Sequence, residues 1–449
     1  MKTATVSKRF GVSRARNGRL LLDAVGTLGL NITAVALNAV VFALLTHRLG
    51  ANAYGDFASA IAWAAIFSIV AVLGLTPLVI REVAAHSSSA SWALLRGLLR
   101  RANQAVALAS TLTIGAAALV GWAIYRDRTQ LLHPYLVALL LVPVIALTSL
   151  RQAAIQGLGR VVVGRLPEAI LVPVLFIALL IPIPRAIGHH FTPAVAVALQ
   201  VGVTFVGFVV GTWLLRRVLP TEVRASAAEY RTASWRRSTA PLLLLNVVMA
   251  ANAQVGTIML GALRHASDAG VFNAAFRVTT FISFIMLAAS YPLSPLVARL
   301  HAEGARRKIE ETAVHTARIV LVATAPLAIV LVAFAGPVLA HLAGHDFGAG
   351  STAVRIMAVG DVVNVLTGFG GLVLVMCGRE SDLARSVALG AVVNIGLAAA
   401  LIPPFGVNGA AIATASSLAL SNLLMTWFAW RRLGVWAAVG RFKTRVAHP

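Results

Sequence analysis

A short polar stretch decides the fold: residues 47–57 read HRLGANAYGDF and separate two long apolar segments, about 20–45 and 57–80. Each segment is long enough for a helix to cross the hydrocarbon of a membrane, which takes about 20 residues. A similar stretch follows about 215 residues later, where LGALR at 260–264 and DAGVF at 268–272 open another apolar segment. The sequence therefore predicts that the chain turns twice in the same way between membrane-spanning helices.

Apolar stretches of this kind follow one another along all 449 residues. Twelve are expected, roughly at 20–45, 57–80, 103–124, 134–151, 167–184, 192–215, 239–261, 271–297, 313–335, 354–375, 384–402 and 407–430. Hydrophobic residues make up 59% of the chain and charged residues 12%, whereas soluble domains carry about 25% charged residues. The pattern predicts an all-α, polytopic membrane protein with 12 transmembrane helices.

The positive charges indicate how these helices are oriented. Of the 38 Lys and Arg residues, 31 fall on one side of the predicted spans, six on the other, and Arg277 lies inside a span. Because cytoplasmic loops retain positive charge, we expect a bacterial inner-membrane protein with both termini in the cytoplasm. The net charge of +23 then reflects topology and attraction to membrane lipids. Nucleic-acid binding is not expected, since the basic residues are dispersed over short loops without a recognition motif.

A second internal correspondence suggests that the chain consists of two related halves. QGLGR at 156–160 and MCGR at 376–379 each follow a span at its cytoplasmic end, and Gly159 and Gly378 are 219 residues apart. We expect an N-terminal lobe over 1–215, a cytoplasmic linker over 216–238 and a C-terminal lobe over 239–449. Because each lobe holds an even number of spans, both lobes have the same orientation, and a central cavity is expected between them.

Three segments resemble a known family. They are residues 49–84 with their YGDF start, the run GVFNAAFR at 270–277, and FGVNGAAIAT at 405–414. These are similar to the polysaccharide-biosynthesis flippases of the multidrug/oligosaccharidyl-lipid/polysaccharide exporter superfamily. The resemblance implies two six-helix lobes and a carrier that turns a polyprenyl-diphosphate-linked oligosaccharide from the cytoplasmic to the outer leaflet by alternating access. It also implies a polysaccharide polymerase and a chain-length protein as partners in surface-polysaccharide synthesis.

Arg277 is the first candidate to contact the diphosphate of such a substrate. It lies about 10 Å deep in its span at 1.5 Å per residue, where a charged side chain is costly unless it faces a cavity or a partner. A guanidinium also offers a planar fork of donors to phosphate oxygens. The alternative is an ion pair with Asp361, the only clearly deep acid. Asp361 is also a candidate for coupling transport to an ion.

Polar amides inside the spans are candidates for binding sugar hydroxyls. They are Asn31, Asn38, Asn252, Gln254 and Asn273. Asn31 and Asn38 are two turns apart on one helix face, and Asn273 lies one turn before Arg277. The alternative is that these amides hold helices together, since Asn and Gln form hydrogen bonds between membrane helices.

Enzyme functions are not favoured, because the sequence contains no phosphate-binding loop, zinc motif or nucleophile elbow. No cofactor or metal is expected. Two alternatives stay open: a cation-coupled small-molecule or multidrug antiporter of the same superfamily, and an intramembrane glycan polymerase or glycosyltransferase. A cation exporter is expected to concentrate acids in its cavity, whereas only Asp361 is deep here. The sequence therefore favours an anionic substrate.

Overall fold

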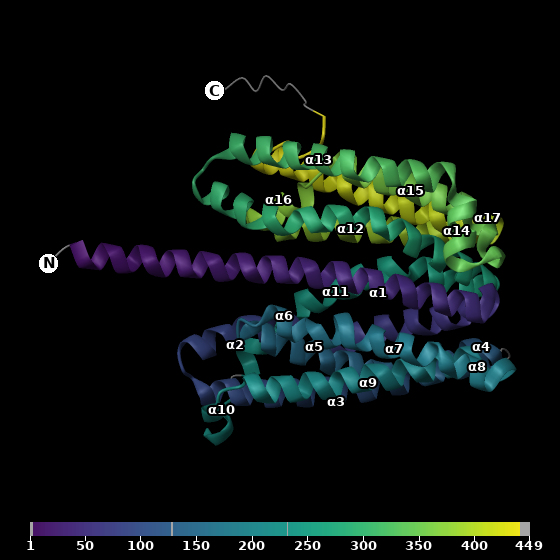
Figure 1. The fold of residues 1–449 in the computed structure, drawn as a ribbon, viewed down its shortest axis with the longest axis horizontal. Helices are drawn as coiled ribbons and strands as arrows, with labels where there is room; N and C mark the ends of the chain where they lie inside the picture. The colour runs from purple at the N-terminus through teal and green to yellow at the C-terminus, as the bar shows by residue number, and fades with distance from the viewer. Residues whose placement is uncertain (1–2, 127–128, 231, 441–449) are drawn as a thin grey trace.

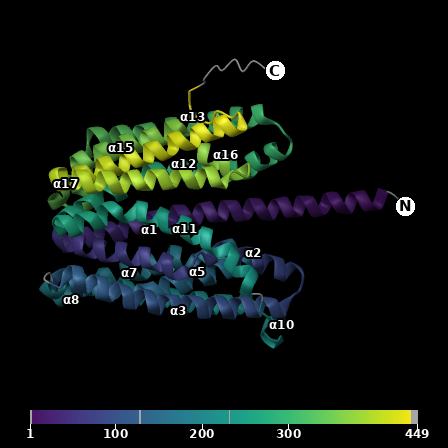
Figure 2. The same cartoon turned by 180° about the vertical axis from the view of Figure 1, so that it is seen from behind.

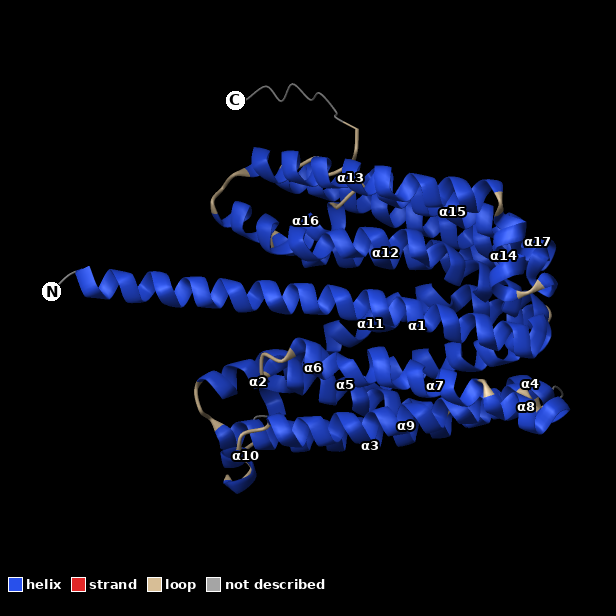
Figure 3. Ribbon diagram, in the orientation of Figure 1, coloured by secondary structure: helices blue, strands red, loops and turns tan. Residues whose placement is uncertain are grey.

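The protein is all-helical in a computed structural model that describes residues 3–126, 129–230 and 232–440. Helices and loops make up these ranges (Figure 3). Within them, ten helical segments are long and apolar enough to cross a membrane. The chain is therefore a multi-pass membrane protein, as predicted.

The helices form two bundles that lie side by side, with α1 and α11 between them (Figures 1 and 2). The first half of the chain contains α1 (Thr3–Val72), α2 (Leu75–Ser88), α3 (Trp92–Tyr125), α4 (Thr129–Ala138), α5 (Leu141–Gly157), α6 (Val161–Leu166), η1 (Pro167–Leu171), α7 (Val172–Leu180), α8 (Pro182–Ile187), η2 (Gly188–His190), α9 (Pro193–Val218) and α10 (Thr221–Ala225). The second half contains α11 (Thr232–Leu263), α12 (Ala266–Ala302), α13 (Arg306–Ala333), α14 (Ala335–Ala343), η3 (His345–Gly350), α15 (Ser351–Thr367), α16 (Gly370–Met376) and α17 (Glu380–Leu433).

The number of separate spans differs from the twelve predicted, because two pairs of predicted spans are joined. Helix α1 runs through the first two predicted spans with a non-helical residue at Gly50, and α17 runs through the last two with one at Gly406. Both glycines have positive φ, which a residue without a Cβ adopts at little cost. The chain therefore changes direction without a loop, and each pair counts as one helical segment.

Two predicted spans are also interrupted. The span expected over 57–80 breaks at Leu73 and Gly74, both with positive φ, before α2 begins. The span expected over 354–375 breaks at Gly368, where the main chain of the segment after α17 approaches closely: a Cβ added at Gly368 would lie 2.0 Å from the carbonyl oxygen of Ala437. Hydropathy does not register such breaks, because the flanking residues remain apolar.

The backbone repeats itself at three pairs of turns. Ala90 and Gly304 both have positive φ (51° and 68°), as do Gly159 and Gly378 (79° and 74°). Gly188 and Gly406 share almost the same angles, with φ 53° in both and ψ −121° and −125°. The pairs are separated by 214, 219 and 218 residues. These recurring angles support the internal repeat inferred from the sequence.

The two bundles touch closely where α1 and α12 cross. A Cβ added at Gly55 would lie 1.6 Å from the carbonyl oxygen of Ala266, and one added at Gly270 would lie 2.3 Å from that of Ala51. Nearby, the ring of Tyr54 meets that of Phe347 in η3 edge-on, with 5.9 Å between centroids. The glycines of the two repeated sequence stretches therefore allow the backbones to meet.

The turns α2–α3 and α12–α13 lie at the same end of the molecule as the start of α1, whereas α8 and α14 lie at the opposite end (Figure 1). The predicted linker over 216–238 includes α10, which packs on α3: Arg96 donates to the carbonyl oxygens of Arg224 and Ser226. Residue 231 of this linker lies outside the described residues, as do residues 1–2 and 441–449 of the two basic tails.

Candidate functional site

A cavity of about 510 Å³ lies between the two bundles and contains most of the predicted site residues. Helices α1 and α12 form most of its wall, and α6 and α11 contribute one residue each. Five predicted residues line it, namely Asn31, Asn38, Gln254, Asn273 and Arg277. The structure therefore brings together side chains from both halves of the chain.

Arg277 is held by a short hydrogen-bond network at the crossing of α1 and α12. Its Nε donates to Oδ1 of Asn273 at 3.0 Å, and the Tyr54 hydroxyl donates to the same oxygen at 2.9 Å. Asn273 in turn donates through Nδ2 to Oγ1 of Thr257 at 3.3 Å. Asn273 is buried, whereas Arg277 is exposed to the cavity. The hydrogen bond to Asn273 thus positions the guanidinium through its Nε, and the Arg277 side chain lines the cavity.

The predicted ion pair between Arg277 and Asp361 is not formed. Asp361 is buried in α15 and accepts a hydrogen bond of 2.6 Å from Ser283 Oγ in α12. Ser283 lies six positions after Arg277, so the two side chains leave α12 about 120° apart and at different depths. Among the described residues, Arg277 has no acidic partner within ion-pair distance. Asp361 as an ion-coupling residue stays a prediction.

The remaining amides differ in whether they line the cavity or lie away from it. Asn31 donates through Nδ2 to the Tyr291 hydroxyl at 2.9 Å and so links α1 to α12, whereas Asn38 donates to Ala34 of its own helix at 2.8 Å. Asn252 is not among the residues that line the cavity. It accepts hydrogen bonds from Asn394 (2.8 Å) and Ser417 (3.3 Å) and connects α11 to α17. The structure therefore gives Asn252 the helix-joining role that was the alternative for these amides.

Arg165 is a cavity residue that the sequence did not single out. It lies in the last turn of α6, on the N-terminal bundle, and lines the same cavity as Arg277. Its position in a basic loop is explained by topology alone when only the sequence is considered. One feature sets it apart from the other basic loop residues: it lies directly before an apolar span that starts with Pro167 and Glu168.

The cavity lining favours anions. Arg165 and Arg277 contribute positive charge, and no Asp or Glu occurs among the described residues that line it. Polar amides and six aromatic rings surround these charges, the rings being Phe42, Phe57, Phe276, Phe281, Phe284 and Tyr291. An arginine forms strong, charge-assisted hydrogen bonds with the oxygens of a phosphate or carboxylate. Such a lining suits a negatively charged ligand that also carries apolar or ring-shaped groups.

Two helical bundles around a cationic cavity define a class, the membrane transporters with a two-bundle carrier fold. Residues 21–301 match the family model of the polysaccharide biosynthesis proteins, and residues 241–400 match that of the MatE proteins. The chain belongs to the polysaccharide biosynthesis protein family, within the multidrug/oligosaccharidyl-lipid/polysaccharide exporter superfamily. The resemblance inferred from the sequence is confirmed. The chain is accordingly a transporter of this superfamily and not an enzyme.

Individual proteins are similar at lower identity. A probable low-salt glycan biosynthesis flippase, Agl15 of Haloferax volcanii, is 24% identical over 166 residues, which are 37% of this chain. The alignment spans about a third (35%) of the length of that curated relative. Among solved structures, an inward-facing multidrug resistance MATE transporter aligns over 92% of this chain and 98% of its own, with a TM-score of 0.71 and 13% identity.

The lipid II flippase MurJ in an inward closed conformation is also similar in structure. It aligns over 91% of this chain and 87% of its own, with a TM-score of 0.66 and 13% identity. At such identities these likenesses show the fold alone. The all-helical, polytopic fold of the exporter superfamily, which the resemblance implied, is thereby confirmed.

Proposed function

We propose that this protein flips a polyprenyl-diphosphate-linked oligosaccharide from the cytoplasmic to the outer leaflet of a bacterial inner membrane, for surface-polysaccharide synthesis. The observation that carries the proposal is the cavity between the bundles, with Arg165 and Arg277 in its wall and no acidic residue among its described lining residues. A diphosphate loses its hydration in hydrocarbon at a prohibitive cost. An arginine-lined cavity replaces part of that hydration with charge-assisted hydrogen bonds.

The domain organisation supports alternating access. In the proposed topology, α1 and α17 each cross the membrane twice around Gly50 and Gly406, so that the ten helical segments provide twelve crossings. The lobes are then 1–215 and 239–449, joined by the linker 216–238, with both termini in the cytoplasm. The close contact of Gly55 and Gly270 closes the outer side. Separation of the lobes at this contact, with closure at the cytoplasmic side, would expose the cavity to the outer side, and the reverse motion would return it to the cytoplasmic side.

A cation-coupled multidrug antiporter is the second candidate, and the MatE match over 241–400 favours it. The cavity charge argues against it, because a cationic drug would meet two arginines and no lining carboxylate among the described residues. Asp361, the buried acid, is bonded to Ser283 and is not among the lining residues of this cavity. An anionic lipid-linked glycan therefore fits the lining better than a cationic drug.

Deletion of the gene in its native host tests the proposal. We expect lipid-linked oligosaccharide to accumulate on the cytoplasmic leaflet and the surface polysaccharide to disappear, with restoration by the wild-type chain and not by an Arg277→Ala variant. The partners of the proposal, a polymerase and a chain-length protein, would then lack substrate. Normal surface polymer together with new sensitivity to cationic drugs would overturn the proposal in favour of the antiporter.

A further inference from the structure

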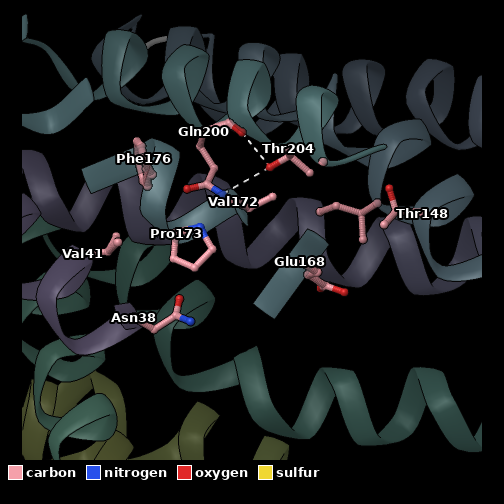
Figure 4. Close-up of a pocket in the computed structure, with 11 residues that line it drawn as sticks. Asn38, Val41, Thr148, Glu168, Val172, Pro173, Phe176, Gln200 and Thr204 are labelled. Carbon is pink, nitrogen blue, oxygen red and sulfur yellow. Dashed lines mark hydrogen bonds between the residues drawn. The ribbon is translucent and has the colours of Figure 1, made fainter. Parts of the chain in front are cut away.

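The N-terminal bundle contains a side cavity of about 250 Å³ between α1, α5, η1, α7 and α9, with several neutral polar side chains in a mostly apolar wall (Figure 4). Gln200 and Thr204 of α9 face it and are bonded to each other: Gln200 Nε2 donates to Thr204 Oγ1 at 3.3 Å, and Thr204 Oγ1 donates to the carbonyl oxygen of Gln200 at 2.7 Å. The buried ring of Phe176 closes one side. The cavity therefore combines neutral donors and acceptors with an apolar wall.

This side cavity adjoins a smaller cavity that Arg277 lines. The smaller cavity, of about 160 Å³, is lined by Arg277 together with Gln200, Thr204 and Phe176. Asn38 lines the side cavity, the smaller cavity and the central cavity. Arg277 and the Gln200–Thr204 pair are therefore walls of one common cavity, next to Asn38.

We propose that the side cavity binds the sugar attached to the diphosphate, which deepens the proposed function and rests on it. In a lipid-diphosphate-linked glycan the first sugar is bonded to the diphosphate itself, so its site has to adjoin the phosphate site. The smaller cavity provides this adjacency, because Arg277 and the Gln200–Thr204 pair line it together. The volume points to a small group: pockets for drug-sized ligands measure about 300–1,000 Å³, and the side cavity, at about 250 Å³, is slightly smaller.

The chemistry of the lining matches hydroxyl groups. An amide and a hydroxyl each donate and accept hydrogen bonds, as sugar hydroxyls do, and Asn38, Thr148, Gln200 and Thr204 are all of this kind. The π-helical turn η1 forms part of the wall, and such turns occur frequently at functional sites.

A bound metal cation is a poorer fit to the same cavity. Glu168 is the single carboxylate among the described residues that line it, is exposed, and accepts a hydrogen bond from Gln152. Hard cations in proteins take several oxygen ligands, commonly from more than one carboxylate. The described part of the chain also contains no group of three or more His, Cys, Asp or Glu residues arranged to hold a metal.

Binding of paired probes to the full-length protein in nanodiscs tests the inference. The probes are farnesyl diphosphate and farnesyl-diphosphate monosaccharides that carry glucose, galactose or N-acetylglucosamine. We expect wild type to bind at least one glycosylated probe about tenfold more tightly than farnesyl diphosphate. Gln200→Met and Thr204→Val should remove this preference and leave the affinity for farnesyl diphosphate unchanged, since each removes neutral hydrogen-bonding groups worth about a factor of three to ten.

The control is Thr111→Val on α3, because Thr111 makes the same bond to the carbonyl four residues earlier as Thr204 does. It should keep the sugar preference. The inference is overturned if wild type binds all probes with equal affinity, or if Gln200→Met and Thr204→Val weaken the binding of glycosylated and unglycosylated probes alike. It is also overturned if the sugar preference depends on sodium ions and is lost in Glu168→Gln alone. A different result would contradict the proposed function: binding of farnesyl diphosphate by Arg277→Ala as tightly as by wild type.

Discussion

Arg277 acts through its charge if the cavity binds a diphosphate, and its surroundings make this testable. Asn273 and Tyr54 fix one side of the guanidinium, and Asp361 is bonded elsewhere, to Ser283. We predict that Arg277→Ala leaves folded protein yield close to wild type, because no buried acid loses its partner, while flipping falls at least a hundredfold. Arg277→Lys should restore flipping only in part, because an ammonium lacks the planar fork. Surface polymer and folded yield are the measurements.

The double variant Arg277→Ala/Asp361→Asn is the control for this prediction. If Arg277 mainly neutralised Asp361, the single Ala variant would lose about 3–5 kcal/mol of stability, and the second substitution would restore it. We expect no such restoration. Recovery of both yield and surface polymer in the double variant would eliminate Arg277 as a substrate ligand.

Sequence reasoning located part of the site and missed part of it for physical reasons. A charged residue deep in a span is rare and costly, so Arg277 could be recognised from its position alone. Asn252 could not be separated from the cavity amides, because an amide within a span binds a ligand or joins helices, and only the neighbouring helix decides. Arg165 was hidden among basic loop residues, since charge asymmetry reports the side of the membrane and not the direction of a side chain.

At the scale of elements, the turn between α2 and α3 repeats the backbone geometry of the turn between α12 and α13, although the residues differ. Ser91 and Ala305, which follow the positive-φ residues, have nearly the same angles, φ −84° and ψ 65° against φ −85° and ψ 60°. The preceding position is Gly304 in one turn and Ala90 in the other. A left-handed conformation is less favourable for alanine than for glycine, because the alanine Cβ makes close contacts with the backbone.

We therefore predict opposite effects of two substitutions. Ala90→Gly should stabilise the protein and Gly304→Ala should destabilise it, each by up to about 1 kcal/mol, because the cost of the left-handed conformation exceeds the opposing change in chain entropy. No atom lies within 4 Å of a Cβ added at Gly304, so the effect there is conformational and not steric. Apparent melting temperatures of the purified protein in detergent give both values. Stabilisation by Gly304→Ala would contradict the shared turn geometry.

At the scale of the whole molecule, hydropathy and charge predicted the class of fold but not the continuity of its helices. The lengths of the apolar segments predict the number of membrane crossings, and the family resemblance implies the two-bundle arrangement. The joins at Gly50 and Gly406 and the break at Gly368 depend on backbone angles and on the close approach of other segments. These are tertiary features, and a hydropathy profile contains no information about them.

The orientation of the molecule gives the last prediction, because charge asymmetry predicts the side on which each loop is exposed. Arg185 in α8 belongs to the sparsely charged side, and Arg307 at the start of α13 to the richly charged side. The two positions lie at opposite ends of the molecule (Figure 1). Replaced singly by cysteine in a Cys377→Ser background, Arg185→Cys should react with an impermeant maleimide added to intact cells, and Arg307→Cys only after the membrane is opened.

Cys377 itself should give little background even where it is retained, because burial raises the pKa of its thiol and so lowers the reactive thiolate fraction. Lysed cells provide the control that both introduced cysteines are reactive, and the side chain of Arg307 is 92% exposed. Labelling of Arg307→Cys from outside intact cells, or protection of Arg185→Cys there, would reverse the topology. The closed contact of Gly55 and Gly270 would then face the cytoplasm, and the cavity would load its substrate from the opposite leaflet.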